Sequence, residues 1–293
     1  MRRHLSKQAQ WVRQLLPACE GDISLAKRQL VWLKEKVLTD SRGQSLLRSS
    51  PLTDAEEQQI DLYIKQRVEC HKPLQYILGT QPFCELDIVT RPPVLIPRWE
   101  TEDWTYRLID RLRGHRLPHP LRVLDICTGT GCIALGLSAH LPKNTTEITG
   151  IDVSTDAIEL ANHNRIVHAD RLRNPVSFQQ MDAFKFCLRS KKQPHLIVSN
   201  PPYITAEEYA HLDKDVKDWE DKRALVADEE GTSVHKRVIK IASQIPETGL
   251  PRLVMEMGIN QAELLTEEMS NAGFKNIEVW KDLADRDRVI LGE

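Results

Sequence analysis

The run Val123-Leu124-Asp125-Ile126-Cys127-Thr128-Gly129-Thr130-Gly131 passes from apolar residues directly into a glycine-rich turn. The apolar half predicts a buried strand, and the residues from about Cys132 onward predict a helix. Glycine lets a backbone approach a ligand closely, and the first turn of a helix has free N–H groups that can bind one. The run therefore predicts a ligand-binding turn between a strand and a helix.

An acidic residue follows at the end of the next predicted strand. Asp152 ends the strand-like run that comes after Gly131, where a carboxylate can accept hydrogen bonds from ribose hydroxyl groups. The two features together fit a cofactor that contains adenosine. The pattern Gly129-x-Gly131-x-x-Ala134 also satisfies the dinucleotide fingerprint, so these residues alone leave NAD and S-adenosylmethionine both open. A glycine turn with a purely structural role is the simplest alternative.

Strands and helices alternate from about Thr101 to the end of the chain. Alternating β and α units are typical of a mostly parallel, doubly wound sheet. We therefore expect an α/β domain over residues 100–293. The compact strand-like runs are residues 121–126, 147–152, 176–181, 195–200, 251–257, 276–280 and 288–291.

The residues before this domain have a different pattern. Residues 1–72 have helical apolar periodicity, and Thr53-x-x-Glu56 is a capping box. Prolines and glycines then separate short apolar runs such as Gln75–Leu78, which predicts a connecting hairpin and an extended segment over residues 73–99. No catalytic constellation lies in the helical region, so a small partner-binding domain is expected there.

Composition limits the class of protein. The 293 residues are 41% apolar and 28% charged, and 40 Lys and Arg against 42 Asp and Glu give a net charge of −2. These values argue against a disordered chain and against a protein that coats nucleic acid with basic charge. No window reaches the ~18 apolar residues of a membrane-spanning helix, so a soluble protein is expected. The six cysteines include no C-x-x-C pair, which favours reduced thiols and no metal site.

The most specific motif is Asn200-Pro201-Pro202-Tyr203, directly after the apolar run 195–199. Ligands of open α/β sheets lie at the carboxyl ends of the strands, so the tetrapeptide should border the same crevice as the glycine turn. The Asn200 side-chain oxygen and the Pro201 carbonyl can each accept one N–H bond, and the Tyr203 ring offers a flat face. The motif predicts a substrate with an NH₂ group conjugated to a carbonyl or an aromatic ring. A plain proline turn is the alternative.

A second acidic residue supports a bound adenosine. Asp182 follows the predicted strand over residues 176–181 and can accept a hydrogen bond from an adenine amino group. A solvated loop acid is the alternative. Phe184 can pack on adenine or in the core, and we expect the core.

The segment 1–19 carries a possible targeting signal. It contains Arg2, Arg3, Lys7 and Arg13 and no acidic residue, as in a mitochondrial presequence. A first domain helix with a basic outer face explains the same pattern, so both interpretations stay open from this segment alone.

Over nearly its whole length the chain resembles the HemK/PrmC family, the N5-glutamine methyltransferases that modify the Gly-Gly-Gln glutamine of peptide-chain release factors. The helical run Lys27–Leu33 is most similar to mitochondrial members from fungi, which favours a mitochondrial over a cytoplasmic location. The matching segments are Val94–Arg98 with Glu100–Glu102, Asp125–Gly131, Asn200–Tyr203, Glu220 with Ala224-Leu225, Glu256-x-Gly258-x-x-Gln261, Lys281–Leu283 and Asp287–Val289.

The resemblance implies a Rossmann-like methyltransferase sheet with a small N-terminal domain that binds the release factor. It implies methyl transfer from S-adenosylmethionine to the side-chain amide nitrogen of the glutamine in the Gly-Gly-Gln loop, with no membrane and no direct nucleic-acid binding. The catalytic residues would be Asn200, Pro201 and Tyr203, with Pro202 also contacting substrate. The cofactor-binding residues would be Cys127, Thr128, Gly129, Thr130, Gly131, Asp152, Asp182, Ala183 and Asn200.

The chain departs from the family pattern at a few positions. Cys127 stands where many members have glycine, and Trp99 and Asp221 replace prolines. Ala183 stands where some relatives have an aromatic residue, which puts adenine stacking at that position in doubt. None of these changes removes a group that methyl transfer needs.

Three other functions fit parts of the sequence. Adenine has the same kind of NH₂ group, so an adenine-N6 methyltransferase acting on RNA or DNA is the nearest alternative. Such an enzyme must reach a flipped base, and residues 1–90 have 13 basic and 11 acidic side chains, too even a balance for a strong phosphate-binding domain. An NAD-dependent oxidoreductase, or a partner-binding protein without activity, would leave the Asn-Pro-Pro-Tyr tetrapeptide unexplained.

Overall fold

The structure is a computed structural model that describes residues 6–43, 51–115, 118–188 and 193–293. The chain divides into two compact units. The first comprises Met1–Thr80 with Asp213–Trp219, and the second comprises Gln81–Leu212 with Glu220–Glu293. The sequence pattern gives no sign that the short segment Asp213–Trp219 belongs with the N-terminal helices.

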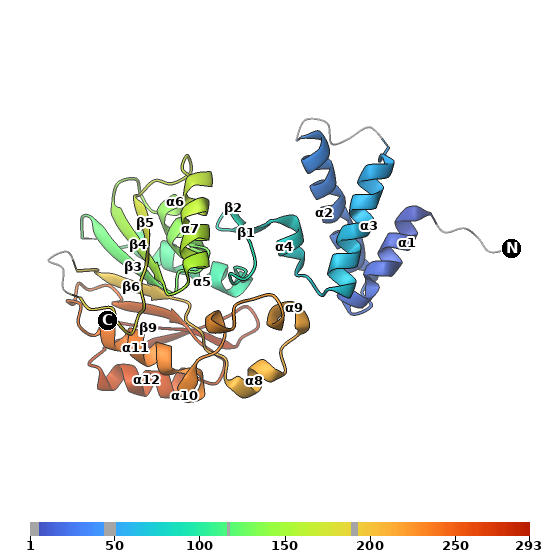
Figure 1. The fold of residues 1–293 in the computed structure, drawn as a ribbon. Helices are drawn as coiled ribbons and strands as arrows, with labels where there is room; N and C mark the ends of the chain where they lie inside the picture. Colours follow the sequence, from blue (N-terminus) through green and yellow to red (C-terminus); the bar gives the residue numbers. More distant parts are fainter. Residues whose placement is uncertain (1–5, 44–50, 116–117, 189–192) are drawn as a thin grey trace. The chain divides into compact units, whose positions relative to one another are not determined.

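The first unit is built from helices (Figure 1). They pack around buried apolar side chains such as Trp11 and Leu15. Thr53 and Glu56 form the capping box that the sequence predicted. Residues 1–5 of the possible presequence lie outside the described residues, whereas Lys7–Leu15 is a helix of this unit. The elements are α1 (Lys7–Leu15), η1 (Leu16–Cys19), α2 (Ile23–Arg42), α3 (Asp54–Glu69), α4 (Leu74–Leu78) and α9 (Lys214–Lys217).

The expectation that Gln75–Leu78 belongs to a connecting hairpin or extended segment is wrong, because these residues lie in the helix α4. Pro73 precedes the helix, and Gly79 ends it in the left-handed conformation, with φ at 88°. The predicted hairpin begins directly afterwards, with β1 (Thr80–Phe83) paired to β2 (Leu86–Val89).

The second unit contains a sheet with the strand order β5-β4-β3-β6-β7-β9-β8. Neighbouring strands from β5 to β7 are parallel, and β9 is antiparallel to both of its neighbours. The expected doubly wound, mostly parallel sheet is therefore confirmed. The strands are β3 (Leu121–Ile126), β4 (Thr146–Asp152), β5 (Val176–Gln180), β6 (Leu196–Ser199), β7 (Leu253–Glu256), β8 (Glu278–Lys281) and β9 (Asp287–Gly292).

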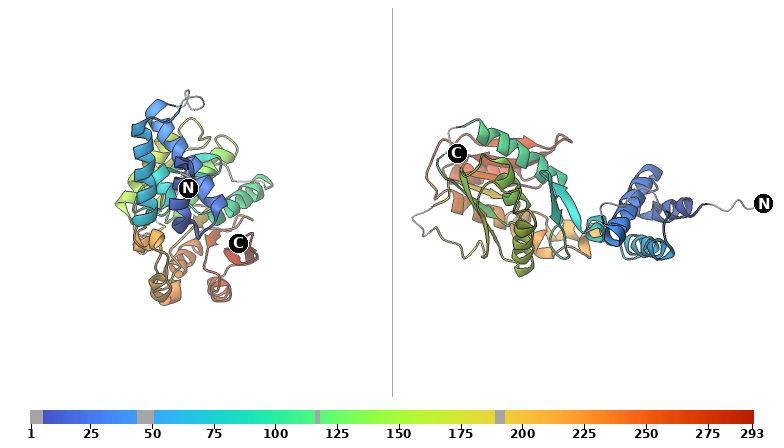
Figure 2. Two further views of the ribbon diagram at one scale, coloured as in Figure 1. Left: turned by 90° about the vertical axis from the view of Figure 1, so that its right-hand side faces the viewer. Right: turned by 90° about the horizontal axis from the view of Figure 1, so that it is seen from above.

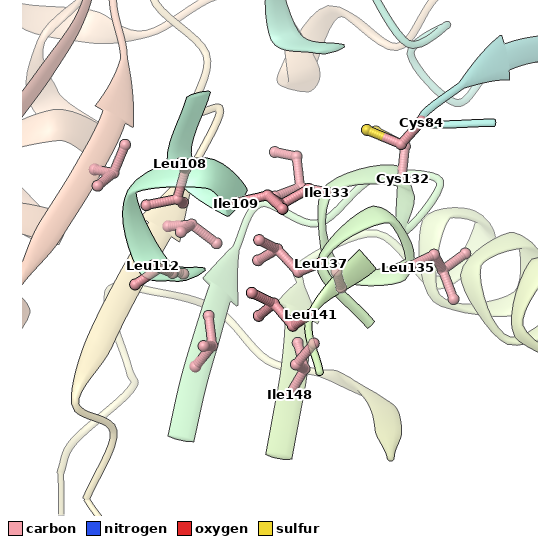
Figure 3. Close-up of a cluster of buried hydrophobic side chains, with 14 of the residues drawn as sticks. Cys84, Leu108, Ile109, Leu112, Cys132, Ile133, Leu135, Leu137, Leu141 and Ile148 are labelled. Atoms are coloured by element: carbon pink, nitrogen blue, oxygen red, sulfur yellow. The ribbon is translucent and has the colours of Figure 1, made fainter. Parts of the chain in front are cut away.

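Helices cover both faces of this sheet, as the views in Figures 1 and 2 show. On one face, α5 and α6 share a buried apolar core with the strands, and Figure 3 draws Leu108, Ile109 and Leu112 of α5 with Ile133 and Leu137 of α6 as members of this core. On the other face, α11 and α12 pack with the strands in a second core. The helices are α5 (Trp99–Arg113), α6 (Cys132–His140), α7 (Thr155–Val167), α8 (Ala206–Ala210), η3 (Lys222–Ala224), α10 (Asp228–Gly231), α11 (Ser233–Ala242) and α12 (Ala262–Asn271).

Two features of the side chains bear on the composition argument. The six cysteines are free thiols, of which Cys19, Cys84 and Cys132 are buried, Cys127 is half-buried, and Cys70 and Cys187 are exposed. Within the described ranges, no helix combines the length and apolar character needed to cross a membrane.

Candidate active site

The glycine turn lies between β3 and α6, at the carboxyl end of the central strand. Gly131 has φ at 82°, and a Cβ there would meet the Phe178 ring at 2.6 Å, so packing requires a glycine. Gly129 has φ at 53°, and a Cβ there would meet no atom within 4 Å. Gly131 is therefore needed by the fold, and Gly129 leaves open space beside the turn.

That open space is part of a cavity of about 300 Å³ in the second unit. The cavity lies at the carboxyl ends of β3, β4 and β6, where ligands of open α/β sheets bind. Additional walls come from Pro93–Leu95 of the connector and from Asp221, Arg223 and Ala224. The sequence-predicted site residues that line it are Cys127, Gly129, Asp152, Asp182, Ala183, Asn200 and Pro202.

Asp152 joins the glycine turn to the end of β4. Its Oδ2 accepts a hydrogen bond from the Gly129 N–H at 2.9 Å, and its Oδ1 accepts one from the Ser154 N–H at 2.9 Å. Burial raises the pKa of the Asp152 carboxyl above its usual value, against the lowering effect of these two N–H bonds. A carboxylate has about four acceptor positions, so Asp152 can still accept from a ligand hydroxyl.

Other predicted residues of the turn lie behind the cavity wall. Thr128 donates a hydrogen bond from its hydroxyl to Asp125 Oδ2 at 2.6 Å. Asp125 is fully buried, and this desolvation raises its pKa to about 7. The Thr130 carbonyl accepts from Asn164 Nδ2 at 3.1 Å. These contacts hold the turn in shape from inside the fold.

The opposite end of the cavity is bordered by Asp182, Ala183 and Phe184. Phe184 is 57% exposed, so the expectation that it belongs to the core is wrong. Its N–H donates to Asp182 Oδ1 at 2.9 Å, which turns the loop directly after β5. The Phe184 ring therefore provides an aromatic surface at the cavity, next to the position where Ala183 lacks one.

Asn200 is oriented by residues that sequence reasoning did not place in the site. Asn200 Nδ2 donates to Thr101 Oγ1 at 3.1 Å, and the Thr101 hydroxyl donates to Glu256 Oε2 at 2.7 Å. The Trp104 Nε1–H donates to the same Glu256 oxygen at 2.9 Å. Thr101 and Glu256 matched family signature segments, but their residue types alone gave them no role.

Tyr203 faces the same buried glutamate from the other side. Its hydroxyl donates to Glu256 Oε1 at 3.2 Å, and burial raises the pKa of Tyr203 well above its usual range. Its carbonyl accepts from Gln261 Nε2 at 3.1 Å, while the Gly258 N–H donates to Gln261 Oε1 at 2.8 Å. The segment Glu256–Gln261 therefore holds Tyr203 at both ends. Tyr203 and the buried Pro201 do not line the cavity that Asp152 and Asn200 border.

The cavity residues fit a bound adenosine group. Gly129 leaves room for a ligand against the backbone, Asp152 is an acceptor suited to a ribose, and Asp182 with Phe184 suits a planar base. Within the described part of the chain, no group of His, Cys, Asp and Glu side chains has an arrangement that could hold a metal ion.

Comparison with known proteins identifies two matching domain families. The family described as "Methyltransferase small domain" matches residues 103–216, and the "PrmC N-terminal domain" matches residues 9–79. The second match covers most of the first unit.

Curated relatives extend over nearly the whole chain. A "Release factor glutamine methyltransferase" of Geobacter sulfurreducens is 33% identical, covering 98% of this chain and 96% of its own. The "Probable MRF1 mitochondrial N(5)-glutamine methyltransferase mtq1" of Schizosaccharomyces pombe is 33% identical, covering 92% and 88%. A protein of Salmonella typhimurium that is also named "Release factor glutamine methyltransferase" is 33% identical, and the match covers 83% of each chain.

Among solved structures, the hMettl16 catalytic domain in complex with the MAT2A 3′UTR hairpin 1 is similar with a TM-score of 0.53. The two are 16% identical, and the match covers 90% of this chain and 91% of that one. At this identity the likeness shows the fold alone.

Proposed function

The chain belongs to the release factor glutamine methyltransferase family, and we propose that Asn200 and Pro201 bind the NH₂ group of the glutamine in a release factor's Gly-Gly-Gln loop. The resemblance predicted from the sequence motifs is thereby confirmed. The protein is a methyltransferase that uses S-adenosylmethionine to methylate glutamine of a release factor at N5. The relatives therefore do not support the two alternatives of an NAD-dependent oxidoreductase and a partner-binding protein without activity.

The observation that carries the proposal is that Asn200 and Asp152 border one cavity. Asp152 is proposed to accept from the ribose hydroxyls and Asp182 from the adenine amino group, with Gly129 leaving space for the cofactor against the turn. When bound, S-adenosylmethionine supplies an electrophilic methyl group on a sulfonium. Asn200 lines the same cavity. A glutamine amide nitrogen held by Asn200 would therefore lie at the same edge of the sheet as the cofactor, at the carboxyl ends of the strands.

The chemistry that the residues must supply is mainly positioning. A glutamine amide nitrogen is a poor nucleophile because its lone pair is delocalised into the carbonyl. Asn200 Oδ1 and the Pro201 carbonyl would accept its two N–H bonds and orient the lone pair, with the Tyr203 ring beside the amide. Orientation of this kind can lower a barrier by roughly 7–11 kcal/mol in favourable cases.

The helical unit is proposed to bind the body of the release factor. Its match to the PrmC N-terminal domain supports this role. Exposed apolar side chains on α2 are the first place to test it, because Val31 is 51% and Trp32 42% exposed. Exchange of both for glutamate should weaken release-factor binding and leave cofactor affinity unchanged; equal binding would assign the unit another role.

A mitochondrial location is also proposed. The Schizosaccharomyces pombe relative is named as mitochondrial, and the segment 1–19 of this chain lacks acidic side chains. Imaging of the tagged full chain tests the proposal, and a cytosolic signal would contradict it.

Mass spectrometry of candidate release factors tests the substrate directly. Each factor is incubated with this protein and methyl-labelled S-adenosylmethionine, with a factor whose Gly-Gly-Gln glutamine is replaced by alanine as the control. Label on that glutamine alone is expected. Label on RNA would favour the adenine-N6 alternative, and label on another residue of the factor would remove the Gly-Gly-Gln loop as the target.

A further inference from the structure

Two buried side chains, those of Thr101 and Glu256, hold the amide of Asn200 in a hydrogen-bonded series. Asn200 Nδ2 lies 3.1 Å from Thr101 Oγ1, and Thr101 Oγ1 lies 2.7 Å from Glu256 Oε2. Thr101 and Glu256 are each 1% exposed. The Glu256 carboxylate is itself held by the Trp104 Nε1–H at 2.9 Å and by the Tyr203 hydroxyl at 3.2 Å.

The donors and acceptors of this series permit one orientation of the Asn200 amide. An ionised carboxylate only accepts, and a threonine hydroxyl has a single hydrogen. That hydrogen is donated to Glu256, so Thr101 Oγ1 can only accept from Asn200. Asn200 must therefore present its NH₂ to Thr101, and its Oδ1 is directed away from Thr101. Burial raises the pKa of Glu256, but a proton on Oε1 would not change this orientation, because Oε2 accepts from both the Thr101 hydroxyl and the Trp104 Nε1–H.

The opposite orientation would place two acceptors against each other. With the amide flipped end for end, Asn200 Oδ1 would face Thr101 Oγ1, whose only hydrogen is already used. A buried polar group left without its partner shifts an equilibrium by roughly ten- to a hundredfold. The acceptor that the structure shows for the Asn200 NH₂ is Thr101 Oγ1, at 3.1 Å.

We propose that Thr101 is a positioning residue that fixes Asn200 with its oxygen toward the substrate, so that the site selects an NH₂ donor and discriminates against a carboxylate. This inference rests on the proposed function of Asn200 as the acceptor for the glutamine amide. Glutamine and glutamate have nearly the same shape, and they differ in whether they present N–H donors or only acceptors. A freely rotating Asn200 could bind either, whereas a fixed Asn200 binds the amide.

Thr101→Val tests the proposal, because valine keeps the shape of threonine and removes the hydroxyl. Thr101→Ser restores the hydroxyl. Thr105→Val is the matched control: Thr105 is also buried on α5, and its hydroxyl donates to the Thr101 carbonyl at 2.7 Å without contact to Asn200. Each full-length variant is first checked by thermal unfolding, and Thr101→Ala replaces Thr101→Val if the latter does not fold.

Two measurements separate positioning from a general structural role. The first is kcat and KM for methylation of a release factor with Gly-Gly-Gln. The second, made with bound S-adenosylhomocysteine, compares the Kd of that factor with the Kd of the same factor carrying Gly-Gly-Glu. Thr101→Val should lower kcat by roughly ten- to a hundredfold and reduce the preference for Gly-Gly-Gln by about tenfold. Thr101→Ser and Thr105→Val should stay within about threefold of wild type both in kcat and in the preference for Gly-Gly-Gln over Gly-Gly-Glu.

The outcomes distinguish this inference from the proposed function. If the wild-type protein does not label the Gly-Gly-Gln glutamine, the proposed function fails. If it does, but Thr101→Val keeps the wild-type preference for glutamine over glutamate, only the role of Thr101 fails. Loss of activity in Thr105→Val as large as in Thr101→Val would likewise overturn it, because the effect would then belong to the helix and not to the hydroxyl.

Discussion

Arg98 donates two hydrogen bonds from Nη2 to the carboxylate of Glu220, at 2.8 and 2.6 Å, across 122 positions of sequence. The Glu220 side chain is 1% exposed and that of Arg98 is 33% exposed. Directly beside this ion pair, the Asp221 N–H donates to the Pro93 carbonyl at 2.7 Å. The pair therefore ties together the two segments that supply the outer walls of the cavity that Asp152 and Asn200 border.

Arg98→Met should loosen that wall. Removal of one partner of a buried ion pair can cost about 3–5 kcal/mol, because the other charge stays buried. Since Arg98 is one-third exposed, water can reach part of the pair, and we expect a loss of roughly 2 kcal/mol in the free energy of unfolding together with weaker S-adenosylmethionine binding. Urea unfolding and calorimetry measure the two effects.

Lys281→Met is the control for this variant. Lys281 pairs with Asp285 at 3.2 Å, with side chains 51% and 87% exposed, and surface pairs of this kind contribute little. The control should be close to wild type in both measurements. An Arg98→Met protein that behaves in the same way would mean that the ion pair does not shape the cavity.

Asp152→Ala should weaken S-adenosylmethionine binding. The change removes a proposed acceptor for the ribose and also the acceptor of the Gly129 and Ser154 N–H groups. Loss of a hydrogen bond to a charged group costs about 1.5–3 kcal/mol, or roughly 10- to 150-fold in Kd. Calorimetry with the folded variant measures this, with the exposed Asp170→Ala as control. An unchanged Kd would remove Asp152 from the cofactor site.

The buried carboxyl of Asp125 should make the stability of the fold depend on pH. Burial raises its pKa from 3.8 to about 7, so between these values the folded protein keeps a proton that the unfolded chain releases. The contribution of Asp125 to the free energy of unfolding is therefore fully present below about pH 4, and it is lost as the pH rises through 7. Asp125→Asn cannot ionise, and its amide oxygen can still accept from Thr128.

Urea unfolding of the protein without cofactor, at several values between pH 5 and pH 8, measures the difference between Asp125→Asn and wild type. The difference should grow with pH and reach on the order of 4 kcal/mol in favour of the variant, because each unit of pKa shift corresponds to about 1.4 kcal/mol. The comparison cancels other titrating groups, such as His235, whose pKa burial lowers to about 4. A difference that does not change with pH would show that Asp125 is ionised in the fold.

Those parts of the fold that depend on local pattern could be predicted from the sequence. The strand that contains Asp125, the turn at Gly129 and Gly131, and the acid at Asp152 follow from apolar runs, glycine and spacing. The helix at Leu74–Leu78 was missed because so short an apolar run has no period that separates helix from strand. Proline before it and glycine after it were the available signals.

Contacts between distant segments could not be predicted in the same way. Thr101 and Glu256 lie 155 positions apart, and neither residue type in its local sequence indicates a partner. Trp219 donates from Nε1 to the Cys70 carbonyl at 3.0 Å, which places a late segment within the helical unit. Exposure of Phe184 depends on the loop after β5, and hydrophobicity alone predicts burial.

Asn200→Ala tests the proposed acceptor of the substrate NH₂ group. The change removes Oδ1 from the cavity edge and leaves the glycine turn and Asp152 in place, so S-adenosylmethionine should bind with similar or moderately reduced affinity. Loss of one positioned polar group at a reacting centre commonly lowers kcat by about 10²–10³, and we expect that loss in methylation of the Gly-Gly-Gln glutamine. Single-turnover kinetics measure the rate, and calorimetry measures cofactor binding. Asn162→Ala on α7 is the control, because the Asn162 amide donates within its own helix, to the Ile158 carbonyl at 3.0 Å. If Asn200→Ala methylates the release factor at the control rate, another group must hold the glutamine amide.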